Sequence, residues 1–176
     1  MELDVPTRRL RLRLPKTEDA VTIFEQHRSA EMKYWYPLRP FSSVKTAELA
    51  VEDWAKNFAE GRLPWSVMVE KVEDGRVIGD LTFDRGKNLS GEAEIRGYFC
   101  IFSAEANLGY ASEALSAILA QRGKVFGEPR IFARILRGNR AAVRVVEKCG
   151  FEFLREEFGT DDDFYGDGVL VFCKTL

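Results

Sequence analysis

The sequence predicts a mixed α/β fold of the α+β kind, with seven strands and four helices in the order β-α-α-β-β-β-α-β-α-β-β. Three features lead to this prediction. Segments with apolar residues at every second position are interspersed with segments in which apolar residues recur at helical spacing. Three strand-like segments follow one another in the middle of the chain. Turn residues separate most of the elements.

Length and composition favour a single globular domain over residues 1–176. The chain is 45% hydrophobic and 31% charged, the mixture of a protein that buries an ordinary core. Its net charge is −2, from 26 basic and 28 acidic side chains, so neither nucleic acid nor a membrane surface is an expected partner. No segment has the apolar length of a signal sequence or a membrane span, so we expect a soluble, cytoplasmic protein.

Histidine and cysteine are too sparse to suggest metal or nucleophile chemistry. Cys100, Cys149 and Cys173 lie far apart in the sequence and are odd in number, so we expect buried free thiols and neither a disulfide framework nor a zinc site. His27 is the single histidine. It ends a helical pattern, and we expect it at the surface.

The first third of the chain is expected to form one strand and two helices. Leucines alternate with arginines in residues 8–14, which predicts a strand with one buried face. Thr17 stands at the N-cap of a first helix and Ser43 at the N-cap of a second. Between these helices, the aromatic residues and two prolines of residues 31–41 predict a short helix or a turn.

The other elements follow from the same patterns. Strands are predicted at residues 64–71, 76–84, 92–102, 130–136, 151–158 and 169–174. Apolar stripes predict a helix that begins near Gly109 and reaches Val125, and another from Asn139 to Lys148 that Gly150 terminates. The middle of the chain is therefore an antiparallel meander, and its last part alternates helices with strands.

A glycine-containing loop opens the third helix. The loop ANLGY would direct backbone N–H groups of the first helical turn toward one place, which suits an anionic ligand such as phosphate. The alternative is that Gly109 only allows a tight turn between strand and helix. The loop has neither the Gly-Lys-Ser/Thr end of a Walker A loop nor the three spaced glycines of a dinucleotide-binding fingerprint.

Three segments, in order, resemble the GNAT acetyltransferase superfamily. LGYASEAL (108–115) is similar to its acetyl-CoA loop and helix, GNRAAVRVVEKCGF (138–151) to its asparagine-containing helix, and TRRLRLRLPKTEDA (7–20) to its first strand and helix. The resemblance spans nearly the whole chain and is closest to the subgroup of ribosomal-protein-alanine N-acetyltransferases and several antibiotic acetyltransferases. It implies an N-acetyltransferase that uses acetyl-CoA as co-substrate, needs no metal, and acts on a primary amine of a small molecule or a protein N-terminus.

The same resemblance implies a fold and a cofactor site. The fold is a mixed, strongly twisted seven-stranded sheet flanked by about four helices, in which the fourth and fifth strands splay apart around the pantetheine arm. The arm would pair with the backbone of Cys100, Ile101 and Phe102, and Asn139 would bond it unless that residue is only a helix cap. The pyrophosphate would be held by Asn107, Leu108, Gly109, Tyr110, Ala111 and Ser112.

The loop departs from the family pattern at two positions. Ala106 stands where the family usually has glutamine or arginine, and Asn107 replaces the usual first glycine. In a loop one residue shorter, Asn107 itself would take the glutamine or arginine position. Because backbone donors bind the phosphates, these changes affect affinity more than chemistry.

For catalysis, Glu94 is the candidate base. It is the acid of AEIRGY, similar to AEIGY in the family, on the strand that would face the cofactor; the alternative is an exposed strand glutamate. Ala142 and Val146 occupy the positions where family members often have a serine and a tyrosine near the thiol. Either the thiolate leaves unassisted, or another side chain protonates it, with Tyr165 as a weak candidate.

Acceptor recognition is expected from the loops around the first helices and the last hairpin. These contain Tyr34, Trp35 and Tyr165, together with the acidic residues 161–163. The acids either attract a cationic amine or form a solvated turn, and the aromatic side chains either contact the acceptor or pack in the core. The sequence does not identify the acceptor.

Two other functions stay open. One is a catalytically weak module that binds CoA or regulates, because an acid is missing and the loop is altered. The other is a loop that binds a different phosphate ligand. The C-terminal edge strands also leave a homodimer possible.

Overall fold

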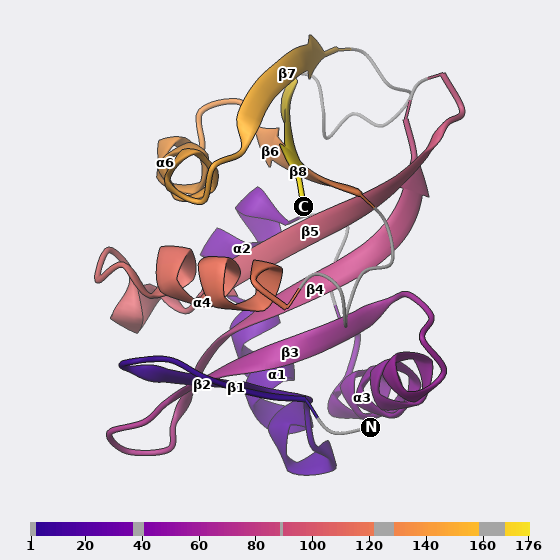
Figure 1. Ribbon diagram of the computed structural model, residues 1–176. Helices are drawn as coiled ribbons and strands as arrows, with labels where there is room; N and C mark the ends of the chain where they lie inside the picture. Colours follow the sequence, from indigo (N-terminus) through magenta and orange to yellow (C-terminus); the bar gives the residue numbers. More distant parts are fainter. Residues whose placement is uncertain (1–2, 37–40, 89, 122–128, 159–167) are drawn as a thin grey trace.

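The computed structural model describes residues 3–36, 41–88, 90–121, 129–158 and 168–176, which form one mixed sheet with helices on both faces (Figure 1). In spatial order the strands are β1 (Asp4–Pro6), β2 (Leu10–Arg13), β3 (Trp65–Lys71), β4 (Val77–Lys87), β5 (Ala93–Ile101), β6 (Arg130–Leu136), β8 (Val169–Thr175) and β7 (Glu152–Glu157). The helices are η1 (Thr17–Asp19), α1 (Ala20–His27), α2 (Ala30–Trp35), α3 (Val44–Ala59), η2 (Ser103–Glu105), α4 (Tyr110–Leu119) and α6 (Arg140–Lys148).

The predicted α/β fold is confirmed, because every expected strand and helix is present. The structure adds β1, which pairs antiparallel with β2 and gives the sheet eight strands rather than seven. With three residues that include Pro6, β1 is too short to show an alternating pattern. The segment expected to be a short helix or a turn contains α2. Val125, which the third helix was expected to reach, lies outside the described residues.

A buried ion cluster fixes the start of the first helix. Asp19 accepts hydrogen bonds from Nη1 of Arg13 at 2.7 Å and from the backbone N–H of Lys16 at 2.7 Å. Lys16, rather than Thr17, therefore holds the N-cap position of η1. Nε of Arg13 also donates to Glu70 at 2.6 Å, and these hydrogen bonds, that to Asp19 first, raise the pKa of the Arg13 guanidinium.

The prediction that His27 lies at the surface is wrong. His27 ends α1 as expected, but it is only 3% exposed, and its Nε2 lies 3.1 Å from Oδ1 of Asp80 on β4. Its position relative to Ala20 and Ile23 is i+7 and i+4, which places all three on one helical face. This face packs toward the sheet, so the histidine is buried with its apolar neighbours.

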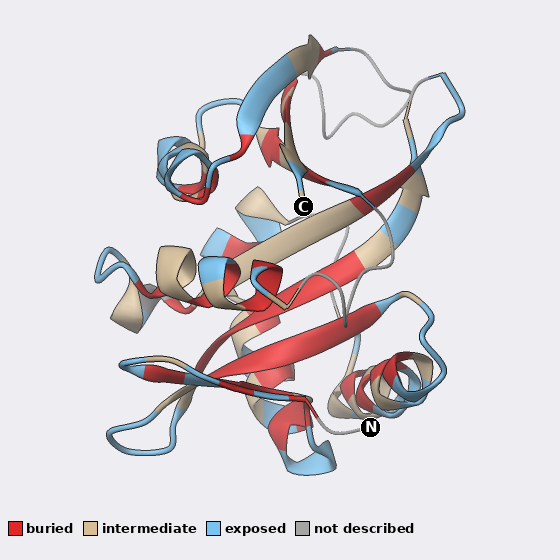
Figure 2. Ribbon diagram, in the orientation of Figure 1, coloured by how far each residue is buried: buried red, intermediate tan, exposed pale blue. Residues whose placement is uncertain are grey.

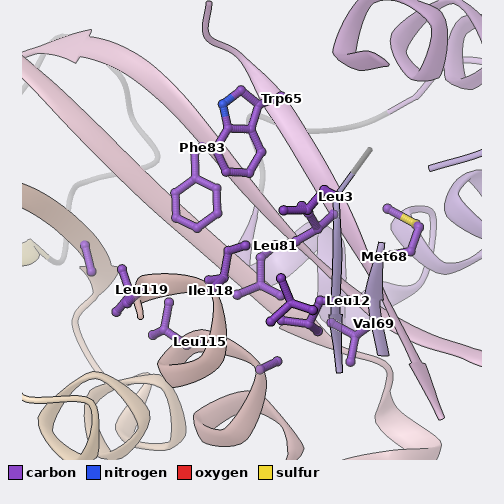
Figure 3. Packing of buried hydrophobic residues seen from close by; sticks show 14 of the residues in the cluster. Leu3, Leu12, Trp65, Met68, Val69, Leu81, Phe83, Leu115, Ile118 and Leu119 are labelled. Atoms are coloured by element: carbon purple, nitrogen blue, oxygen red, sulfur yellow. The ribbon is translucent and has the colours of Figure 1, made fainter. Parts of the chain in front are cut away.

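The core lies between the sheet and its helices. In Figure 2, the buried residues concentrate on β3 and β4 in the middle of the sheet. Figure 3 shows Leu115 and Ile118 of α4 close to Leu81 of β4, and all three belong to the main apolar cluster. A fully buried side chain of this size stabilises the fold by about 1.5–3 kcal/mol, so the central strands form a rigid base for the loops at their ends.

The sheet is split between β5 and β6. Along the described residues of these parallel strands, one pair, Arg96 and Phe132, bridges them. By contrast, β5 pairs with β4 along the whole length of β5. Beyond this pair the two strands diverge. In the predicted numbering, which lacks β1, they are the fourth and fifth strands, the two that the family resemblance implied would splay apart.

Two further expectations concern thiols and membrane spans. Cys100, Cys149 and Cys173, all within the described residues, form no disulfide; Cys149 is buried and the other two are half-buried. Burial raises the pKa of the Cys149 thiol, which keeps it protonated. Within the described ranges, no helix has the length and apolar character needed to cross a membrane.

Candidate functional site

The loop before α4 contains two residues in the left-handed region of backbone space. Gly109, the N-cap of α4, has a φ of 82°, and Asn107 has a φ of 64°. Asparagine adopts this conformation more readily than other non-glycine residues, so Asn107 holds a backbone shape that glycine would otherwise supply. The departure from the family pattern at this position therefore leaves the turn intact. The first N–H groups of α4 have no partner within the helix.

Arg9, which is not among the predicted site residues, holds this loop from the turn between β1 and β2. Its Nη1 donates to the backbone oxygen of Leu108 at 3.0 Å, its Nε donates to Glu113 at 2.7 Å, and its guanidinium lies 4.3 Å from the ring centre of Tyr110. Thr7 donates a further hydrogen bond to Glu113 at 2.6 Å. Burial raises the pKa of Glu113, but the hydrogen bonds from Thr7 and Arg9 outweigh it, so the carboxyl group stays ionised.

A first cavity of about 500 Å³ lies between the open half of β5, the start of α4 and α6. It brings together all of the predicted cofactor-binding residues except Leu108, whose side chain is exposed: Cys100, Ile101, Phe102, Asn107, Gly109, Tyr110, Ala111, Ser112 and Asn139. Arg140, Arg144 and Lys148 of α6 add positive charge to its wall. The cavity thus combines a free strand edge, a helix N-terminus and cationic side chains, which suits an extended ligand with phosphates.

A second cavity, of about 440 Å³, lies on the other side of the split. Its wall contains Asp84, Arg96 and Arg134 and several aromatic rings. Of the predicted acceptor residues, Trp35 lines this cavity, whereas Tyr34 is 67% exposed and is not among the residues that line either cavity. Tyr165 and the acidic residues 161–163 lie outside the described residues.

The two cavities meet where the sheet opens. The residues that line both of them are Trp35, Tyr36, Phe99, Asn139 and Ala142. Asn139 is the N-cap of α6, where its side chain accepts a hydrogen bond from the N–H of Ala142 at 3.1 Å. The hydroxyl of Tyr36 donates to the backbone oxygen of Phe99 at 2.5 Å. A group carried by a ligand in the first cavity can therefore meet a ligand in the second.

The structure does not bring Glu94 to this junction. Glu94 lies two residues before the bridging Arg96, on the closed side of the split, and it is not among the residues that line either cavity. It is neither an exposed strand glutamate nor a cavity wall: it is 3% exposed, and Nη2 of Arg155 donates to it at 2.9 Å. Arg155 also donates to Glu157. Burial raises the pKa of Glu157, but hydrogen bonds from Arg134 and Arg155 outweigh burial, so the pKa is lowered overall.

Comparison with known proteins identifies the class that this fold and site define. The family model described as an acetyltransferase (GNAT) domain matches residues 9–152, so the chain belongs to the GNAT acetyltransferase family. It is an N-acetyltransferase, a class of enzyme that acetylates amines.

Individual relatives agree with this assignment. The chain is 30% identical over 147 residues to the uncharacterized N-acetyltransferase YoaA of Bacillus subtilis, covering 83% of this chain and 81% of the relative. Its fold matches that of a ribosomal-protein-S5-alanine acetyltransferase from Vibrio fischeri, with a TM-score of 0.81, 17% identity and coverage of 98% and 96%. It also matches Mycobacterium smegmatis RimJ in complex with CoA-disulfide, with a TM-score of 0.77, 18% identity and coverage of 99% and 86%.

Proposed function

We propose that the protein transfers the acetyl group of acetyl-CoA to a primary amine by direct attack. Acetyl-CoA would occupy the first cavity and the amine the second. The observation that carries this proposal is that the two cavities share a wall, formed by Phe99, Asn139 and Ala142, where the sheet splits. Each cavity has a volume within the range of small-molecule sites, which is about 300–1,000 Å³.

In this proposal the chain binds acetyl-CoA mainly through its backbone. The main chain of Cys100, Ile101 and Phe102 pairs with the pantetheine arm, and the N–H groups at Gly109, Tyr110 and the following residues bind the pyrophosphate. Membership of the subgroup that includes ribosomal-protein-alanine N-acetyltransferases and several antibiotic acetyltransferases is a further proposal about relationship, not about the acceptor, which the fold shared with the Vibrio fischeri enzyme supports.

The chemistry needs a proton acceptor before attack and a proton donor after it. The amine nitrogen bonds to the thioester carbonyl carbon, and the carbon–sulfur bond then breaks as the thiolate leaves and takes up a proton. Two carboxylates are candidate bases: Glu94, which the sequence favours, and Asp84, which lines the acceptor cavity. Asp84 is the better placed, because it lines the acceptor cavity, whereas Glu94 is not among the residues that line either cavity.

Asp84→Asn is expected to lower kcat/KM about 100-fold near neutral pH, because the acceptor ammonium loses its proton acceptor. The defect should shrink as the pH rises above the pKa of the amine, since the amine then arrives neutral. Glu94→Gln is expected to bind CoA normally, to keep the wild-type pH profile and to melt at a lower temperature, because Arg155 loses a charged partner. The pH dependence of kcat/KM distinguishes the two candidate bases. If Glu94→Gln loses the acidic limb of the profile and Asp84→Asn keeps it, the base is Glu94.

Tyr36 is the candidate donor to the departing thiolate, since its hydroxyl lies at the junction of the cavities. We expect Tyr36→Phe to lower kcat about 100-fold with little change in KM, because the ring is kept and only the proton donor is lost. Tyr34→Phe removes the hydroxyl of an exposed neighbour and should have no effect. An unchanged kcat in Tyr36→Phe would mean that the thiolate leaves without assistance.

Arg9→Ala is expected to raise the Kd for coenzyme A about tenfold, because the loop before α4 loses a charged hydrogen-bond partner. Isothermal titration with coenzyme A measures this change. Arg11→Ala is the control, because Arg11 lies two residues further along the chain, in β2, pairs with Asp4 and is exposed. Equal Kd values for the two variants would contradict an anchoring role for Arg9.

Release of free thiol from acetyl-CoA in the presence of an amine panel tests the function itself. We expect turnover that depends on one class of amine. If coenzyme A binds but no amine, peptide or protein N-terminus stimulates thiol release, the protein is a CoA-binding module. If ATP or NAD raises the melting temperature and coenzyme A does not, the loop binds a different phosphate ligand.

A further inference from the structure

The charged side chains of the second cavity share one face of the sheet. Asp84 on β4 lies directly opposite Arg96 on β5, and Arg96 lies opposite Phe132 on β6. Directly opposed residues point to the same face, as do residues two apart on a strand, so Arg134 belongs to this face as well. Asp84, Arg96 and Arg134 therefore converge on the cavity from three neighbouring strands, and the cavity wall includes all three.

Three guanidinium groups lie beside two glutamates at this wall, with Glu94 on the same face of β5 as Arg96. Glu157 accepts hydrogen bonds from Arg134 and Arg155, and Glu94 accepts one from Arg155. Glu94 lies 3.8 Å from Arg96 and 3.9 Å from Arg134, which is beyond hydrogen-bond length. Within the described residues, Nε of Arg96 and Nη1 of Arg134 are buried and have no hydrogen-bond partner. Two glutamates thus lie against three arginines, and Nη2 of Arg96 also donates to the backbone oxygen of Lys87. Arg96 and Arg134 are among the residues that line the cavity.

This wall complements a ligand with one ammonium and one carboxylate group. Side chains directly opposed on antiparallel strands have their Cβ atoms about 5 Å apart, so Asp84 and Arg96 leave the sheet next to each other. The guanidinium of Arg96 then lies over Gly86 and donates to the backbone oxygen of Lys87. In an α-amino acid the ammonium and carboxylate groups are also neighbours. The remaining wall contains the rings of Trp35, Tyr36 and Trp54, which suit an apolar side chain.

We infer that the acceptor is a free α-amino acid with an apolar side chain, whose ammonium group meets Asp84 and whose carboxylate meets Arg96 and Arg134. This inference rests on the proposed acetyl transfer and deepens it by naming the substrate class. Guanidinium groups bind carboxylates in a planar, two-point geometry, and a site built for such a group discriminates against an analogue without it. The product is the N-acetyl amino acid, and coenzyme A leaves with the proton that balances the thiolate.

Matched acceptors test the inference. Initial rates of thiol release at saturating acetyl-CoA are compared for L-phenylalanine, for 2-phenylethylamine, which lacks the carboxylate, and for L-phenylalaninamide, which keeps the shape without the charge. L-Methionine and 3-(methylthio)propylamine form a second pair. We expect kcat/KM for the amino acids to exceed that for their uncharged partners by about 30-fold or more. Equal or faster turnover of the simple amines, or of peptides with the same N-terminal residue, would overturn the inference.

A pair of arginine variants connects the preference to the wall. In Arg96→Met the ratio between amino acid and amine is expected to collapse toward one, because the carboxylate loses its partner. Arg137→Met removes an exposed arginine that pairs with Glu156 and is not among the residues lining either cavity, so it should keep the wild-type ratio. A ratio that stays high in Arg96→Met would also overturn the inference.

Binding separates this inference from the proposed transfer. Titration of L-phenylalanine and 2-phenylethylamine into protein saturated with coenzyme A reports acceptor recognition without turnover. Tighter binding of the amino acid, without thiol release from acetyl-CoA, would support the substrate class and contradict the proposed transfer. Thiol release with every amine and no preference for a carboxylate would support the transfer and contradict the substrate class.

Discussion

Gly109→Val is expected to abolish coenzyme A binding, with a rise in Kd of about 100-fold or more, which corresponds to about 2.7 kcal/mol. Gly109 has a φ of 82°, a conformation that a β-branched residue adopts only with strain. The structure leaves room for a Cβ atom, since the nearest atom to it would be Nη2 of Arg9 at 3.6 Å. The effect should therefore come from a displaced backbone and from a side chain that stands where the pyrophosphate approaches. Isothermal titration measures it.

A second glycine separates strain from loss of the ligand site. Gly91 also has a φ of 82°, and a Cβ atom there would meet nothing within 4 Å. It lies in the turn between β4 and β5 and is not among the residues lining either cavity. Gly91→Val should lower the melting temperature through the same backbone strain but keep the wild-type Kd. Equal losses of binding in both variants would mean that general destabilisation, and not the loop, accounts for the result.

Arg13→Met is expected to lower the free energy of unfolding by about 3–5 kcal/mol. The substitution keeps a long apolar side chain but leaves the carboxylates of Asp19 and Glu70 in the interior without their guanidinium partner. Removing one member of a buried charge cluster costs more than the cluster contributes, because the remaining charges stay desolvated. Urea denaturation followed by circular dichroism measures the change.

The control for this variant is Arg11→Met. Arg11 lies on the same strand and makes a two-point contact with Asp4, but both side chains are nearly half exposed. Water solvates these charges once the pair is broken, so we expect little change in the denaturation midpoint. A loss in Arg13→Met no larger than in Arg11→Met would contradict a stabilising role for the buried cluster.

Local patterns in the sequence were sufficient for the elements of the fold and for most of the cofactor site. Ser43 and Asn139 cap their helices as predicted, because an N-cap depends on residues within one turn. The loop residues around Gly109 are contiguous, so their common place on one cavity follows from a single turn of chain. The expectation for His27 is wrong because its polar side chain suggests an exposed site, whereas its spacing with Ala20 and Ile23 places it on the buried face of α1.

Features that depend on the register between strands could not be predicted from the sequence. The hydrogen bond from Arg9 to Glu113 joins residues 104 positions apart, which come together only in the folded protein. The same is true of Asp84, Arg96 and Arg134, whose common face follows from the pairing of β4, β5 and β6. A motif favours Glu94 as the base, but Arg134 on β6 and Arg155 on β7 surround it with guanidinium groups, and no local pattern predicts these neighbours.

The split between β5 and β6 also bears on cohesion. A single pair, Arg96 and Phe132, is the only ladder contact that the described residues of these two strands make. A ligand that lies in the gap and bonds to the exposed strand edge would link the five strands on one side to the three on the other. Ligand binding and the stability of the sheet are then linked, because a ligand that binds only the folded protein also holds the two parts of the sheet together.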